Sequence, residues 1–256
     1  METSVPLWRT TRVRTLNSPV MRTVDVARGA GYSVQQVRNL ERDGVLPPAA
    51  RTASGYRTYG RIHLCSALAY RNLAAGTGPV EAKRILRAVH ECPRPEALSL
   101  LDAAHARLHR ERERLRHARE AIAAISTEPL DDVRPSDAMS VSELAAALGV
   151  RPSTLRHWDA EGLVVPDRVS ARGTRRYSPA QVQDARIVHQ LRGAGYRIGP
   201  LRALVPHLPR AHRSETVADA LAQREASITA RSQALLDSAA EISTVVSLAL
   251  PGYSDR

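Results

Sequence analysis

The sequence repeats itself, and this repeat limits the folds that the chain can adopt. Shifting the 256-residue chain by 118 positions brings two similar segments into register without a gap. The identical pairs include Met21 with Met139, Ala27 with Ala145, Gly31 with Gly149, Arg38 with Arg156, Gly44 with Gly162, Pro48 with Pro166, Gly55 with Gly173, Arg57 with Arg175 and Tyr59 with Tyr177. The apolar positions between these pairs mostly correspond as well. We therefore expect a duplicated structural unit rather than one large domain.

Each repeat opens with two short helices joined by a turn that contains a glycine. The second helix is predicted to start near Ser33 in one repeat and near Pro152 in the other. It should stop at Gly44 and Gly162, because glycine readily adopts the left-handed conformation that follows a helix end. Two short helices joined in this way are typical of a helix-turn-helix.

Capping residues mark other helix starts. Ser140 and Glu143 have the spacing of a capping box ahead of an apolar run. Ser178, Pro179 and Gln181 are suited to the cap, the first and the third position of a further helix. Between these helices lies a polar segment with arginines, PAARTASGYRTY (48–59) in one repeat and PDRVSARGTRRY (166–177) in the other, which we interpret as a hairpin.

A long amphipathic helix ends each repeat. Apolar residues recur every seven positions in both, which predicts the seam of a coiled coil. The seam residues are Leu101, Leu108, Leu115 and Ile122 in the first repeat, and Leu221, Ile228, Leu235 and Ile242 in the second. The first long helix also carries a charged run, residues 109–120, which we interpret as its solvent-facing side rather than as a nucleic-acid contact.

Composition points to a polyanionic partner and away from several other classes. Lys and Arg number 37 against 26 Asp and Glu, a formal charge of +11, which favours nucleic acid or an anionic surface. We find no secretory signal, no apolar stretch of membrane-spanning length and no G-x-S-x-G, P-loop or H-E-x-x-H motif. We therefore expect a cytoplasmic protein that is not an enzyme, does not bind a membrane and needs no cofactor.

The order of these elements resembles the MerR family of bacterial transcription regulators. The resemblance rests on GYSVQQVRNLERDGVL (31–46) with GYRTY (55–59), and on GVRPSTLRHWDAEGLV (149–164) with GTRRY (173–177). The first repeat departs from the family pattern at Gln36 and at Asn39-Leu40, and the second has His157-Trp158-Asp159 where the family usually has Y-Y-E. The resemblance implies a mainly α fold with two winged helix-turn-helix domains, each followed by a long coiled-coil helix.

The repeat and the resemblance together predict a complete division of the chain. We expect a basic N-terminal extension (1–20), a first winged helix-turn-helix domain (21–90), a first coiled-coil helix (94–126), a linker (127–138), a second winged helix-turn-helix domain (139–208), a second coiled-coil helix (212–249) and a tail (250–256).

The resemblance also implies sequence-specific binding to double-stranded promoter DNA. A recognition helix fits the major groove, where Gln or Asn suits adenine and Arg suits guanine. The candidate contacts on the two recognition helices are Ser33, Gln35, Gln36, Arg38 and Asn39, and Arg151, Ser153, Thr154, Arg156 and His157. The candidate contacts on the wings are Arg51, Tyr56, Arg57 and Tyr59, and Arg172, Arg175, Arg176 and Tyr177. Tyr59 and Tyr177 either donate to a phosphate or pack the wing onto its helix.

Members of this family usually carry one such unit and dimerise through the long helix. We expect the two long helices of this chain to pack antiparallel on each other, giving a single-chain pseudo-dimer that reads an imperfect palindrome and distorts it. RNA polymerase holoenzyme and an unidentified small-molecule effector are candidate partners. Metal sensing is disfavoured, because Cys65 and Cys92 are the only cysteines and a soft-metal site needs more thiolates. One alternative is a small-molecule (drug) binding or sequestering protein on the same scaffold, and another is an architectural DNA-bending protein with little sequence preference.

Overall fold

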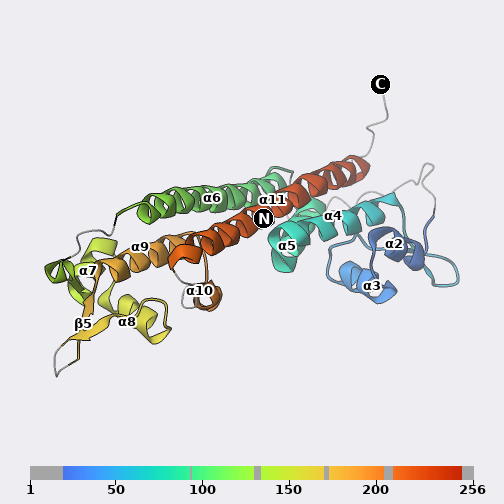
Figure 1. The fold of residues 1–256 in the computed structure, drawn as a ribbon. Helices are drawn as coiled ribbons and strands as arrows, with labels where there is room; N and C mark the ends of the chain where they lie inside the picture. Colours follow the sequence, from blue (N-terminus) through green and yellow to red (C-terminus); the bar gives the residue numbers. More distant parts are fainter. Residues whose placement is uncertain (1–19, 93, 130–133, 170–172, 205–209, 250–256) are drawn as a thin grey trace, which may run out of the picture. The chain divides into compact units, whose positions relative to one another are not determined.

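The computed structural model describes residues 20–92, 94–129, 134–169, 173–204 and 210–249 (Figure 1). Nearly all of the expected N-terminal extension, the tail, part of the linker and Arg172 lie outside these residues. The chain divides into two compact units, each described separately below. Unit 1 comprises residues 1–108 and 228–256, and unit 2 comprises residues 109–227. Each of the two long helices contributes one segment to unit 1 and another segment to unit 2.

Unit 1 is built from helices and one small hairpin. Its elements are α2 (Thr23–Ala30), α3 (Val34–Arg42), β1 (Ala50–Arg51), β2 (Arg57–Thr58), α4 (Arg61–Thr77), α5 (Pro79–Glu91) and the first part of α6 (Arg94–Ser126). Strands β1 and β2 are antiparallel, and an isolated bridge between Met21 and Tyr59 attaches the start of the unit to the hairpin. Helix α3 is thus the second helix of the helix-turn-helix, at the place of the predicted recognition helix, and β1–β2 lies at the place of the predicted wing.

The core of unit 1 includes side chains from both ends of its sequence. Val26, Val37 and Leu73 are fully buried and come from α2, α3 and α4. Leu235 and Ile242, from the C-terminal half of helix α11 (Arg210–Ala249), belong to the same apolar cluster. Unit 1 is therefore closed by a helix segment that follows it by more than a hundred residues in the sequence.

Unit 2 repeats this architecture with a larger sheet. Its elements are η1 (Pro135–Asp137), β3 (Met139–Ser140), α7 (Val141–Leu148), α8 (Pro152–Ala160), β4 (Asp167–Val169), β5 (Thr174–Tyr177), α9 (Pro179–Gly193), α10 (Ile198–Leu204) and the first part of α11. The strands are antiparallel in the order β3-β5-β4, with Arg168 opposite Arg175. Leu155 and Trp158 anchor the recognition helix α8 in the core.

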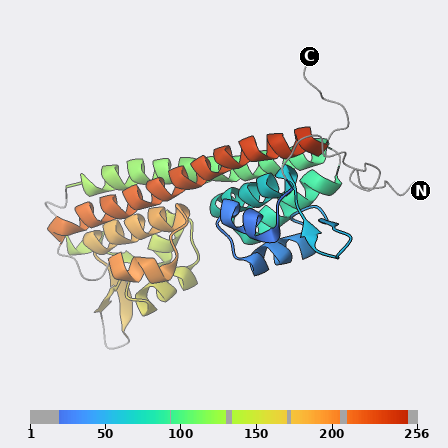
Figure 2. The ribbon, with the colours of Figure 1, turned by 90° about the vertical axis from the view of Figure 1, so that its right-hand side faces the viewer.

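Helices α6 and α11 lie side by side and run antiparallel within each unit (Figures 1 and 2). In unit 2, Arg119 forms an ion pair with Glu225 at 2.7 Å, and Arg224 forms one with Glu111 at 3.1 Å. Of the predicted seam residues, seven are at most 6% exposed and Leu101 is half-buried. The seam therefore faces a helix of the same chain in each unit.

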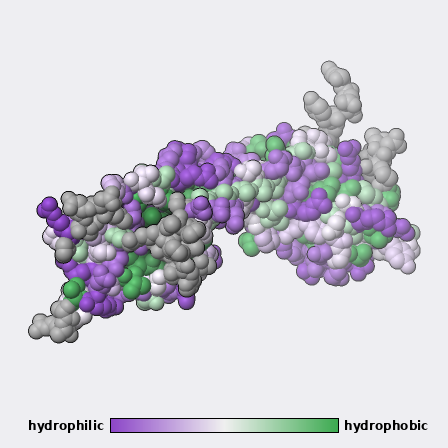
Figure 3. All heavy atoms as spheres, in the orientation of Figure 1, coloured by the Kyte–Doolittle hydropathy of each residue, from purple (hydrophilic) through white to green (hydrophobic). Residues whose placement is uncertain are grey.

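Part of the charged run of α6 faces outward, while Glu111 and Arg119 pair with α11. Arg116 bridges Glu113 and Glu120 on the same helix, at 3.0 and 2.8 Å, and all three side chains are well exposed. Figure 3 shows hydrophilic side chains gathered over this part of the surface. The pattern of solvent-exposed ion pairs matches the interpretation of this run as a solvated helix face.

Local sequence signals placed most helix ends correctly, and the predicted mainly α fold is confirmed. Ser140 and Ser178 cap α7 and α9, each with its reciprocal side-chain partner in a capping box. Gly44 and Gly162 adopt φ values of 71° and 69°, as expected for the residue that follows a helix C-cap. Within the described ranges, no helix is long and apolar enough to cross a membrane.

Candidate nucleic-acid interface

The recognition helix of unit 1 has one buried side and one exposed side. Val37 and Leu40 point into the core, whereas Gln35 and Arg38 are exposed and Asn39 is half-buried. Gln35 Nε2 donates to Asn39 Oδ1 over 3.1 Å, so these two amides form a pair on the outer surface. The helix therefore presents an arginine and two linked amides to solvent.

Two other predicted contact residues of this helix are engaged in its cap. The Gln36 backbone N–H donates to Ser33 Oγ at 3.1 Å, and the Ser33 backbone N–H donates to Gln36 Oε1 at 2.7 Å. This reciprocal capping box satisfies two backbone donors that would otherwise lack partners. Ser33 and Gln36 therefore fix the start of α3.

The recognition helix of unit 2 exposes different chemistry. Leu155 and Trp158 are buried, and Thr154 is half-buried. The exposed predicted residues are Arg151, Ser153, Arg156 and His157. His157 Nδ1 lies 4.0 Å from Glu161 Oε1. Among these exposed predicted residues, Arg38 and Arg156 are the one pair of identical residues at equivalent positions of the two recognition helices.

A carboxylate on α3 fastens the wing of unit 1. Glu41 Oε2 accepts from Arg57 Nε at 2.9 Å and from Tyr59 OH at 3.0 Å, while its Oε1 accepts from the Ala49 backbone N–H at 3.2 Å. Tyr59 is buried, and its burial together with the Glu41 carboxylate raises the pKa of its phenol. Tyr59 therefore packs the wing onto α3, which is one of the two roles that the sequence left open for it.

The rest of the unit 1 wing is exposed. Arg51 donates from its guanidinium to the carbonyl of Gly55 at 3.0 Å, which closes the hairpin. Tyr56 is 75% exposed beside that turn. Both predicted residues therefore lie on the outer surface of the wing.

Unit 2 uses a shorter carboxylate at the equivalent position. Asp159 Oδ2 accepts from Arg175 Nε at 2.7 Å and from the Arg168 guanidinium at 3.0 Å. Tyr177 is fully buried, and its hydroxyl has no hydrogen-bond partner among the residues that the structure describes. Its pKa is raised by burial and by the nearby Asp159 charge. Arg176 is half-buried on β5.

Sequence reasoning missed Glu41 and Asp159. They are the hydrogen-bond acceptors that hold both wings, and neither belongs to the predicted set of contact residues. The 118-residue register offered a signal, because it aligns an acidic residue with an acidic residue at this position, as it aligns Arg57 with Arg175. A shared carboxylate and a shared arginine in two copies of a unit indicate an ion pair.

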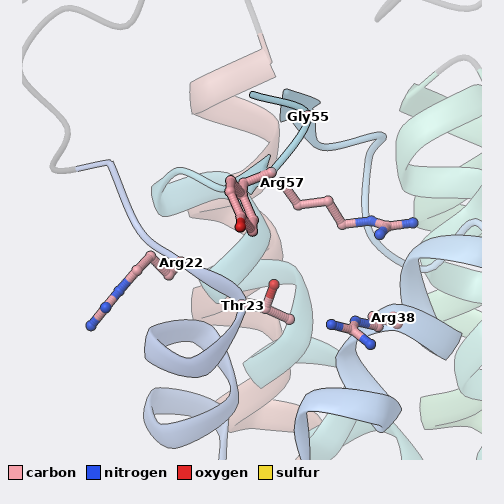
Figure 4. Close-up of a pocket in the computed structure, with 6 residues that line it drawn as sticks. Arg22, Thr23, Arg38, Gly55 and Arg57 are labelled. Carbon is pink, nitrogen blue, oxygen red and sulfur yellow. The ribbon is translucent and has the colours of Figure 1, made fainter. Parts of the chain in front are cut away.

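A basic pocket lies between the helix-turn-helix and the wing of unit 1. It is lined by Arg22, Thr23, Arg38, Gly55, Tyr56 and Arg57. Figure 4 shows Arg38 and Arg57 on one side of Thr23, and the Arg22 side chain extending away on the other. The pocket thus brings together Arg38, Tyr56 and Arg57, which were predicted separately on the helix and the wing. Clustered guanidinium groups of this kind suit a phosphate oxygen.

The fold and these exposed basic surfaces define a class, namely proteins with tandem winged helix-turn-helix domains. A family model described as MerR family regulatory protein matches residues 22–59, and one described as MerR HTH family regulatory protein matches residues 139–208. The two matches support a MerR-family regulator with two MerR-like units in tandem. These matches support a DNA-binding transcription regulator, since members of the family are regulators rather than enzymes. No curated protein and no solved structure gives a match.

Proposed function

We propose that this chain binds promoter DNA as a single-chain pseudo-dimer, with one recognition helix for each half of an imperfect palindrome. The observation that carries the proposal is the pairing of α6 with α11 inside each unit. The ion pairs of Arg119 with Glu225 and Arg224 with Glu111 join the two helices of one chain. A seam that is already buried in this way offers no equivalent surface to a second chain.

The two recognition helices support an operator with unlike halves. At equivalent exposed positions, unit 1 carries Gln35 and Asn39 where unit 2 carries Ser153 and His157. Base edges in the major groove discriminate between such side chains by about 1–3 kcal/mol for each good contact. Arg38 and Arg156 occur in both helices and supply the shared part of recognition.

The wings hold the flanking phosphates in this proposal. Arg51, Arg57, Arg175 and Arg176 lie on or beside the hairpins, so their charge reaches the DNA backbone next to the recognition helix. Each phosphate that they neutralise releases counterions, and the affinity should then fall with salt by about 0.9 logarithmic units per neutralised phosphate. Such contacts fix register and orientation rather than sequence.

Bound in a promoter, the protein distorts the duplex so that RNA polymerase holoenzyme can engage it. The distortion requires on the order of 1–6 kcal/mol, which the contacts of two tethered domains offset. A small-molecule effector is the proposed input. The small-molecule-sequestering alternative predicts a chain that binds its ligand but enriches no DNA.

Two measurements on the full chain test the proposal. Light scattering should give the mass of one chain, both free and bound to operator. Selection from a random duplex pool should enrich one motif with two unlike halves. A stable two-chain species joined through α6 and α11 would refute the pseudo-dimer, and an absence of enrichment at low salt would refute DNA reading.

Matched variants sharpen the selection. Arg38→Ala should weaken one half of the motif and Arg156→Ala the other, because each arginine belongs to one recognition helix. Arg110→Ala, on the exposed side of α6, removes the same charge away from both helices and should leave the motif unchanged. If Arg38→Ala and Arg156→Ala weaken the same half, the assignment of one unit to each half is wrong.

A further inference from the structure

The outer side of α3 offers few side chains that could contact a base. Val37 and Leu40 are buried, and the Gln36 side-chain oxygen is held by the Ser33 backbone. Gln35, Arg38 and Asn39 are the polar side chains on the outer surface of the first two turns that the cap does not hold. Only two of these carry an amide with both a donor and an acceptor.

The bond between Gln35 and Asn39 fixes the orientation of the Asn39 amide. Gln35 Nε2 donates to Asn39 Oδ1 at 3.1 Å, across one helical turn. The oxygen of Asn39 is thereby held on the Gln35 side, and its Nδ2 group on the other. Asn39 Oδ1 keeps one lone pair for a further donor, and Nδ2 keeps its N–H groups.

We infer that Asn39, oriented by Gln35, makes an adenine obligatory in the half-site of unit 1 and in that half only. Adenine presents the N7 acceptor and the N6 amino donor side by side in the major groove. Asn39 Nδ2 donates to N7, and Asn39 Oδ1 accepts from the N6 amino group. Asn39 is the specificity-determining residue, and Gln35 is a positioning residue that acts through it. The inference rests on the proposed function.

Unit 2 has no counterpart of this amide pair. The equivalent positions hold Ser153 and His157, and neither side chain carries an amide. His157 faces Glu161 on the next turn, at 4.0 Å, instead of a residue one turn earlier. The half-site of unit 2 therefore lacks the adenine requirement, so the two halves of the operator differ in the bases that they need.

The first test uses the unmodified protein and altered DNA. Each adenine of the selected operator is replaced in turn by 7-deazaadenine, which lacks N7, or by purine without the N6 amino group. Both replacements should weaken binding about tenfold or more at one adenine in one half, and much less elsewhere. The inference is overturned if no adenine depends on both groups, or if both halves contain one that does.

The second test exchanges the pair between units. Gln35→Ser with Asn39→His should abolish the adenine requirement in the first half, while Ser153→Gln with His157→Asn should create one in the second. A changed base preference at one position is a readout that general damage to the helix would not produce. An adenine requirement that survives the first exchange overturns the inference.

The outcomes separate the inference from the function on which it rests. A wild-type chain that enriches no motif refutes the proposed function and the inference together. A sharp two-part motif without the adenine dependence refutes the inference alone. If an exchanged variant loses helicity, the replacement of N7 and N6 in DNA still decides the question with the wild-type protein.

Discussion

The two buried wing tyrosines should respond in opposite ways to the loss of their hydroxyl. Tyr59 OH donates to Glu41 Oε2 at 3.0 Å, whereas Tyr177 OH is buried and has no partner within the described ranges of the chain. A hydrogen bond to a charged group contributes about 1.5–3 kcal/mol, and a buried polar group without a partner costs about 1–3 kcal/mol. Tyr59→Phe should therefore lower the free energy of unfolding, and Tyr177→Phe should leave it unchanged or raise it.

Urea unfolding of the full chain measures both effects. Far-UV circular dichroism follows the whole protein, and Trp158, which is buried in unit 2, reports on that unit by its fluorescence. A Trp8→Phe background removes the emission of the other tryptophan. The expected sign is a lower midpoint for Tyr59→Phe and an equal or higher Trp158 midpoint for Tyr177→Phe.

The length of the carboxylate explains the difference between the units and gives a cross-check. Glu41 reaches both Arg57 and Tyr59, while Asp159, one methylene shorter, engages arginines only. Asp159→Glu should supply the missing acceptor and stabilise unit 2, and Glu41→Asp should destabilise unit 1. Equal losses of stability in Tyr59→Phe and Tyr177→Phe would refute this reasoning.

Three further predictions concern pH, packing and salt. Burial lowers the pKa of His90 to about 4, so its contribution to stability is present above pH 6.5 and is lost as the pH falls towards 4. The free energy of unfolding should drop by about 2 kcal/mol between pH 7 and pH 5, because the unfolded state takes up a proton on His90 that the folded state does not. The drop should be smaller in His90→Gln, and an equal drop in that variant would show that the burial of neutral His90 does not cause it. Gly76→Ala should destabilise unit 1 by about 1–3 kcal/mol in urea unfolding, because its new Cβ would lie 2.9 Å from Leu235 Cδ2 and 3.1 Å from the Arg231 carbonyl oxygen. Gly193→Ala is the matched control, since no described residue lies within 4 Å of its Cβ, and equal effects would contradict the packing explanation. Arg57→Ala should reduce the slope of log affinity against log salt by about 0.9 in a titration with operator DNA, and an unchanged slope would remove Arg57 from the phosphate contacts.

Helix ends were predictable because they depend on residues close together in the sequence. The duplication was predictable because identical residues recur at a fixed spacing of 118. The caps at Ser140 and Ser178, and the glycines at 44 and 162, follow from backbone rules that act over three or four residues. The mainly α fold follows from the same signals and from the family resemblance.

The division of labour inside the candidate interface was not predictable. Gln36 could serve as a base contact or as a cap, and only the folded geometry shows its oxygen bound to the Ser33 backbone. The Glu41–Arg57–Tyr59 network joins positions 16 and 18 residues apart, so it depends on the path of the chain between α3 and β2. Residue types restrict the possible contacts, and tertiary structure selects among them.

The division of the chain has a consequence for its biosynthesis. Unit 2 is one uninterrupted stretch, residues 109–227, and all of it has left the peptidyl transferase centre before Leu235 and Ile242 are added. Unit 1 starts first but lacks these two core side chains until α11 is nearly complete. Unit 1 therefore cannot be completed until all of unit 2 has been synthesised, although unit 1 starts first in the sequence.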